Sequence, residues 1–161
     1  MSWSRRALLG PACAAMLMSC GFAPVYGPTG EGAALRGSVR IADPENDVDF
    51  AFLARMEERL GAPAAPRYDL TYGIVTAQEA LAIDGSNNIT RFNIEGRIAW
   101  QLTPLGAEAP TLLGTDAAFT SYSATGSTIS TLESERDAER RLAVILADKV
   151  VTRLLADAGG L

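Results

Sequence analysis

The sequence predicts an α+β fold in which two helices pack on one face of a four-stranded sheet. Apolar residues alternate with polar ones in four segments and recur every three or four residues in two others. The segments follow one another as strand, helix, three strands and helix. One apolar face per strand and one apolar stripe per helix are buried together most simply in two layers. We therefore expect a two-layer sandwich of order β-α-β-β-β-α.

The first predicted strand covers residues 35–41 and leads into an acidic stretch at 43–49. Its alternating acids are typical of calcium-binding loops, but Val48 stands where such a loop needs glycine and Ala54 where it needs glutamate. We assign the acids instead to the N-terminus of a helix over 48–60, where the helix dipole favours negative charge. The sequence predicts no metal site.

Three further strands are predicted over residues 67–83, 91–102 and 111–122. The second of these has the clearest alternation, and its side chains expected to face the core are Phe92, Ile94, Gly96, Ile98, Trp100 and Leu102. In the last strand the residues expected to face the core are Leu113, Thr115, Ala117 and Phe119.

A long second helix is predicted from Ser130 to about Ala156. Ser130 and Glu133 have the spacing of a capping box, which marks a helix N-terminus. The first part, 133–141, is mostly charged, whereas the second part carries an apolar stripe that includes Leu146, Val150 and Leu154.

The N-terminus is typical of a bacterial export signal. Arg5 and Arg6 precede an apolar run too short to span a bilayer, and Leu17-Met18-Ser19-Cys20 resembles a lipobox. We predict a lipoprotein signal peptide over 1–19, a lipidated Cys20 with a Gly/Pro-rich tether over 20–33, and one domain over 34–158. The pair of arginines also resembles a twin-arginine signal, so the export route stays open.

Composition restricts the chemistry of the chain. Histidine is absent, and of two cysteines Cys13 would leave with the signal while Cys20 would carry lipid. This leaves no histidine base and no free thiol, so we expect no catalytic residues, no enzyme activity, and no cofactor besides the diacylglycerol and acyl lipid on Cys20. Loss of Arg5 and Arg6 would change the formal net charge from −5 to −7, which argues against a nucleic-acid partner.

The sheet face opposite the helices is expected to be basic. Arginine binds phosphates and carboxylates bidentately, so such a face suits a phosphate-bearing or acidic partner, although an ordinary solvated face has the same pattern. Our candidate binding residues are Arg67, Arg91 and Arg97. The whole predicted face has five arginines and two acids: Arg36, Arg40, Arg67, Asp69, Arg91, Glu95, Arg97 and Gln101.

The segment Cys20-Gly21-Phe22-Ala23-Pro24-Val25-Tyr26 resembles the start of the LPS-assembly lipoproteins of the LptE family. The order of elements and the charged-then-apolar last helix, which includes 135–143, are also similar to that family. The resemblance implies a lipid-anchored protein at the periplasmic face of the outer membrane. It also implies that the protein helps an LptD-like β-barrel to assemble, plugs it, and contacts lipopolysaccharide on its way to the cell surface.

Two other functions fit the same sequence features. One is an auxiliary lipoprotein of another lipid-transport complex that spans the periplasm, and the other is a lipid-binding or LPS-binding module that acts alone.

Overall fold

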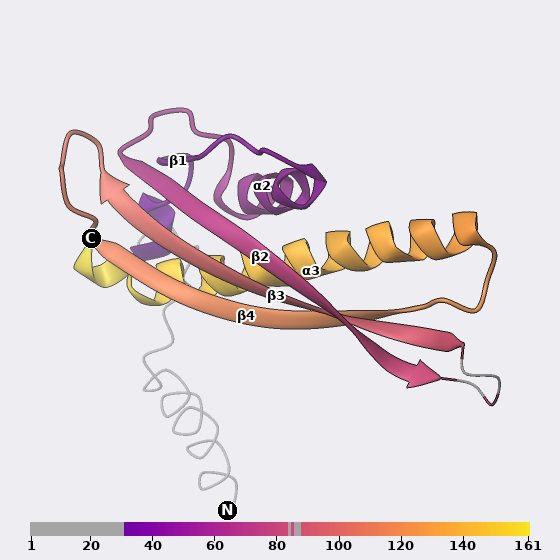
Figure 1. The fold of residues 1–161 in the computed structure, drawn as a ribbon. Coiled ribbons are helices and arrows are strands. Elements are labelled where there is room, and N and C mark those ends of the chain that lie inside the picture. Colours follow the sequence, from indigo (N-terminus) through magenta and orange to yellow (C-terminus); the bar gives the residue numbers. More distant parts are fainter. Residues whose placement is uncertain (1–30, 84, 86–87) are drawn as a thin grey trace, which may run out of the picture.

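Figure 1 shows the computed structural model of the protein, which describes residues 31–83, 85 and 88–161. The predicted signal peptide (1–19), Cys20 and the tether up to residue 30 lie outside the described residues. Within the described part, short 3-10 helices flank the two long helices and four strands. In chain order the elements are η2 (Glu31–Ala34), β1 (Val39–Ile41), α2 (Asp47–Leu60), β2 (Tyr68–Ile83), β3 (Ile89–Pro104), β4 (Leu112–Ser123), α3 (Thr128–Ala156) and η3 (Ala158–Gly160).

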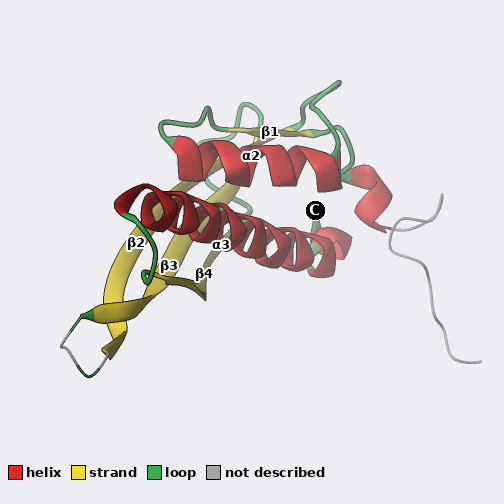
Figure 2. Ribbon diagram, turned by 90° about the vertical axis from the view of Figure 1, so that its right-hand side faces the viewer, coloured by secondary structure: helices red, strands yellow, loops and turns green. Residues whose placement is uncertain are grey.

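The four strands form one sheet in the order β1-β2-β3-β4. β1 pairs with β2 in parallel, whereas β2–β3 and β3–β4 are antiparallel. Helices α2 and α3 lie side by side on one face of this sheet (Figures 1 and 2). The predicted fold class, with two helices on a four-stranded sheet, is confirmed.

Capping residues define both ends of helix α2. The Asn46 side chain accepts hydrogen bonds from the backbone amides of Val48 and Asp49, at 2.9 and 3.0 Å. Gly61 follows the helix with a φ of 82°, a conformation that glycine adopts without strain. The buried face of α2 packs on the sheet and includes Phe52, Met56 and Leu60.

Helix α3 begins earlier than the sequence predicted. Its N-cap is Ser127, whose side chain accepts a hydrogen bond from the backbone amide of Ser130 at 3.3 Å. The prediction of a capping box opened by Ser130 is therefore wrong: Ser130 is already in the first turn, where its hydroxyl donates to the Ser127 carbonyl at 2.9 Å.

The orientation predicted for β4 is also wrong. Leu113 and Phe119 are 74% and 71% exposed, whereas Thr120 and Tyr122 are buried. The reason is the indole of Trp100 on β3, which occupies the core side of β4 at Gly114: a Cβ at Gly114 would lie 2.5 Å from Trp100 Cζ2. The polar side chains on the core side of β4 are hydrogen-bonded. Asp116 accepts a hydrogen bond from Trp100 Nε1 at 3.0 Å, and Thr120 Oγ1 donates to the Ala138 carbonyl at 3.0 Å.

Gly96 allows α3 to lie close to the middle of the sheet. A Cβ at this position would lie 2.8 Å from Leu142 Cδ2 and 3.2 Å from Leu146 Cδ1, and both leucines are fully buried. A side chain on β3 at this point would therefore push the helix away or force the two leucines out of their rotamers.

Replacing Gly96 tests this contact. We expect Gly96→Ala to lower the free energy of unfolding by about 1–3 kcal/mol, because the added methyl group overpacks a closed core. Gly73→Ala is the matched control: Gly73 lies in β2 with nothing within 4 Å of an added Cβ, so this change should be neutral or slightly stabilising. Denaturant unfolding of the two variants measures the difference, and equal stabilities would contradict the tight contact.

Candidate functional site: the open face of the sheet

The sheet face away from α2 and α3 carries side chains from three strands in register. We call this surface the open face. At its centre Arg97 of β3 pairs with Val75 of β2 and with Ala117 of β4. The next row toward the β2–β3 hairpin consists of Ala77, Glu95 and Phe119.

Arg97 lies exposed at the centre of the open face, beside apolar neighbours. In the described part of the chain neither Arg97 nor Arg91 forms an ion pair with another residue. A shallow hollow of about 190 Å³ lies here, and it is lined by Glu95, Gly96, Arg97, Ala117, Ala118 and Phe119. Arg97 therefore shares this hollow with an exposed apolar ring and with a carboxylate.

The structure does not bring the three candidate arginines together. Arg91 pairs with Ser123 near the hairpin end of the sheet, six residues from Arg97, which is about 20 Å along a strand. Arg67 lies at the opposite end, just before β2. There its guanidinium donates to the Ala34 carbonyl and lies 5.5 Å from the centre of the Tyr68 ring. Arg67 thus binds the backbone at the end of η2.

The expected positive surplus of the open face is wrong. Arg36 lies in the turn before β1, and Arg40 forms a two-pronged ion pair with Asp69 at 2.7 and 2.8 Å. Glu79, which the sequence analysis did not place there, pairs with Asn93 and shares the open face. Arg91 and Arg97 are thus matched by Glu79 and Glu95, because β2 adds Glu79 to the face, Asp69 neutralises Arg40, and Arg36 and Arg67 lie outside the strands.

Sequence reasoning missed the apolar part of the open face. Its exposed members include Val75, Leu113 and Phe119, at 72%, 74% and 71% exposure. The signal that could have revealed them is Gly114, since a glycine opposite a core tryptophan marks the core side of β4. To use that signal, one must know that Gly114 of β4 lies opposite Trp100 of β3. The alternation of residues within β4 alone does not give this pairing.

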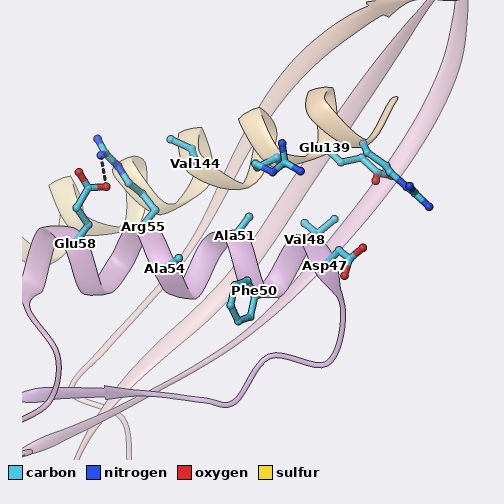
Figure 3. Close-up of a pocket in the computed structure, with 11 residues that line it drawn as sticks. Asp47, Val48, Phe50, Ala51, Ala54, Arg55, Glu58, Glu139 and Val144 are labelled. Carbon is cyan, nitrogen blue, oxygen red and sulfur yellow. Dashed lines mark hydrogen bonds and ion pairs between the residues drawn. The ribbon is translucent and has the colours of Figure 1, made fainter. Parts of the chain in front are cut away.

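A second surface feature lies between the two long helices, and we call it the helix groove (Figure 3). It has a volume of about 610 Å³. Near one end Arg55 of α2 donates to Asp148 of α3 at 3.0 Å and to Glu58 at 2.8 Å. The lining residues are Asp47, Val48, Phe50, Ala51, Ala54, Arg55, Glu58, Arg136, Glu139, Arg140 and Val144.

The groove disfavours the ionised form of the Glu139 carboxyl group. Burial raises the pKa of its carboxyl group, the nearby carboxylates of Glu135 and Asp47 raise it further, and Arg136 opposes them. Because the pKa is higher in the folded than in the unfolded chain, ionised Glu139 destabilises the fold. This cost is present above the folded pKa and disappears as the pH falls below the unfolded value of about 4.3.

Neutralising Glu139 should therefore stabilise the protein in a pH-dependent way. We expect Glu139→Gln to raise the midpoint of denaturant unfolding at pH 7, with the gain disappearing near pH 4. Glu108→Gln makes the same substitution in an exposed loop and controls for the loss of one charge. A gain that persists at pH 3, or no gain at pH 7, would show that the groove does not disfavour the carboxylate.

Two chemical features are absent from the described residues. They contain no group of three or more His, Cys, Asp or Glu side chains placed to hold a metal ion. No helix among them is long and apolar enough to cross a membrane.

The described residues form a small α+β protein whose open face carries both charged and apolar exposed side chains. The family of lipopolysaccharide-assembly proteins LptE matches residues 36–154, which is most of the chain. The chain belongs to this family, and the family match assigns it to lipopolysaccharide assembly. A search of curated proteins gives no match.

Solved structures share the fold at low sequence identity. A lipoprotein from Caulobacter crescentus CB15 is 15% identical, with a TM-score of 0.67 over 81% of this chain and 97% of that chain. The rare lipoprotein B from Shewanella oneidensis is 9% identical, with a TM-score of 0.58 over 76% and 96%. A minor lipoprotein from Acinetobacter baumannii is 14% identical, with a TM-score of 0.55 over 74% and 90%. At such identities these likenesses support the fold alone.

Proposed function

We propose that this protein is an outer-membrane lipoprotein, anchored through Cys20, that assists the assembly of an LptD-like β-barrel and plugs it. In this role it takes part in the passage of lipopolysaccharide through the barrel to the cell surface. The observation that carries the proposal is the match of residues 36–154 to the lipopolysaccharide-assembly family. The anchor would hold the protein at the periplasmic face of the membrane, since the two or three acyl chains of a lipoprotein bind stably.

The open face suits this role chemically. Lipopolysaccharide is an amphiphile with phosphate groups and acyl chains, and the open face sets the exposed Arg97 beside the exposed apolar side chains of Val75 and Phe119. A guanidinium can bind a phosphate with two hydrogen bonds, while apolar neighbours shield an acyl chain from water. The mixed charges of the face also match the polar lumen of a large barrel.

Binding explains these surfaces better than catalysis does. The chain has no histidine, and the described residues contain no candidate metal cluster. The exposed groups of the open face are arginines, carboxylates and apolar side chains, which suit recognition. We therefore assign a non-enzymatic role.

Purification of the tagged full-length protein from detergent-solubilised outer membranes tests the partner. We expect a large β-barrel to co-purify at a one-to-one ratio, and mass spectrometry of the N-terminal peptide to show acyl lipid on Cys20. Recovery with inner-membrane subunits would instead support an auxiliary role in another lipid-transport complex. Recovery of the protein alone, with lipopolysaccharide bound, would support a module that acts by itself.

Charge reversal tests the open face separately from the partner. We expect the double variant Arg91→Glu and Arg97→Glu to bind lipopolysaccharide at least about tenfold more weakly, since each lost charge-assisted contact is worth roughly 1.5–3 kcal/mol. Arg36→Glu makes the same change at an exposed residue outside the open face and should bind normally. If the double variant retains both lipopolysaccharide binding and barrel recovery, the open face is not the binding surface, even with the family assignment intact.

A further inference from the structure

The helix groove lies on the outer side of the two-helix layer, and nothing in the described part of the chain fills it. Its floor is made of small apolar side chains, which include Ala51, Ala54 and Val144 (Figure 3). Phe50 stands at its margin with 65% of its surface exposed. An exposed aromatic ring beside a floor of small residues leaves room for another apolar side chain.

The rim of the groove is electrically balanced. It has three arginines and three acids: Arg55, Arg136, Arg140, Asp47, Glu58 and Glu139. All three arginines already form ion pairs. Arg55 pairs with Glu58 and Asp148, and Arg136 pairs with Glu133 at 3.0 Å. Arg140 lies 3.8 Å from Asp137. A strongly charged occupant would meet a like charge on this rim, so the groove favours an uncharged, apolar one.

Such an occupant is present in the same chain. Residues 21–30 contain no charged residue and carry three large apolar side chains, Phe22, Val25 and Tyr26. Pro24 and Pro28 restrict the conformations of this segment, which lowers the entropy lost when it is ordered. We propose that the segment 21–30 docks in the helix groove, with Tyr26 and Phe22 on its apolar floor.

The position of residue 31 makes this docking sterically feasible. The segment that follows it lies beside the C-terminal end of α2, where the Gly37 amide donates to the Leu60 carbonyl at 2.7 Å and Ser38 Oγ donates to the Ala34 carbonyl at 2.9 Å. From Leu60 back to Ala54 or Phe50 is about 9 or 15 Å along the helix. Residues 31–37 form η2 and the turn after it, and at about 2.0 Å per residue they span about 12 Å at most. Tyr26 lies five residues before Glu31 and Phe22 nine, which adds extended spans of about 17 and 30 Å. The side chain of Tyr26 can therefore reach Ala54, and Phe22 can reach Phe50.

Docking would give the tether a structural role. Cys20 is two residues from Phe22, so a docked Phe22 places the anchor residue near the N-terminal part of α2. The lipid would then fix the orientation of the domain on the membrane. Docking involves contacts within this chain alone, so it does not depend on the identity of the barrel or on lipopolysaccharide binding.

Disulfide trapping in the full-length protein tests the proposal. The pair Tyr26→Cys and Ala54→Cys places one thiol in the segment and one in the groove. The control pair, Tyr26→Cys and Ala64→Cys, uses an exposed alanine whose amide donates to the Gly37 carbonyl at 3.0 Å, so it lies beside the turn that follows η2. An undocked tether would reach Ala64 at least as readily as Ala54. We expect the groove pair to form its intramolecular disulfide about tenfold faster or more, because docking raises the local concentration of the two thiols.

A third substitution distinguishes docking from chance collision. Adding Ala51→Glu to the groove pair should reduce the rate to that of the control pair, because a carboxylate then occupies the apolar floor. Its unfolding midpoint should remain close to that of the parent variant. Equal rates for the groove and control pairs in the purified protein would overturn the proposal. So would disulfide-linked dimers, which would show that the groove takes the segment of a second copy, or mixed disulfides with another protein.

Discussion

The close contact between α3 and the middle of the sheet is the constraint on which the other features depend. Gly96 leaves no side chain between β3 and the helix, so Leu142 and Leu146 pack directly against the strand. The buried stripe of α3 continues from Ala138 to Leu154, and α2 packs beside it. Because this helix pair fills one face of the sheet, it creates the helix groove on its outer side. None of the described helices covers the opposite sheet face.

The same helix also protects the edge of the sheet. β4 is the last strand, and an unpaired edge tends to recruit strands from other chains. Lys149 donates from α3 to the Ala117 carbonyl at 2.8 Å, and Arg141 donates to the Ser121 carbonyl at 3.2 Å. Arg153 adds an ion pair to Asp116 at 3.2 Å. With two carbonyls of the edge strand already bonded, the open face is the sheet surface best suited to a partner.

Sequence patterns predicted the parts of this fold that depend on one element at a time. The alternation in β3 and the stripe of α2 identify their core residues, since each pattern is complete within its own segment. The orientation of β4 depends on where Trp100 places its ring, and the start of α3 depends on whether Ser127 or Ser130 caps it. The expected positive surplus of the sheet face was wrong for the same reason: Arg40 and Arg67 have partners, Asp69 and Ala34, that only the packed chain brings to them.

The exposed apolar residues of the open face contribute little to the stability of the protein. The core lies between the helices and the sheet, so Val75, Leu113 and Phe119 contribute little to folding while 72%, 74% and 71% exposed. Isolated exposed apolar residues are common in folded proteins, but Val75 and Phe119 lie close together on either side of β3, while Leu113 lies farther along β4. Glu95 and Arg97 of β3 lie between Val75 and Phe119 and keep this part of the face hydrated in the free protein. An apolar surface interspersed with charges can remain exposed and still gain free energy when an amphiphile or a barrel wall covers it.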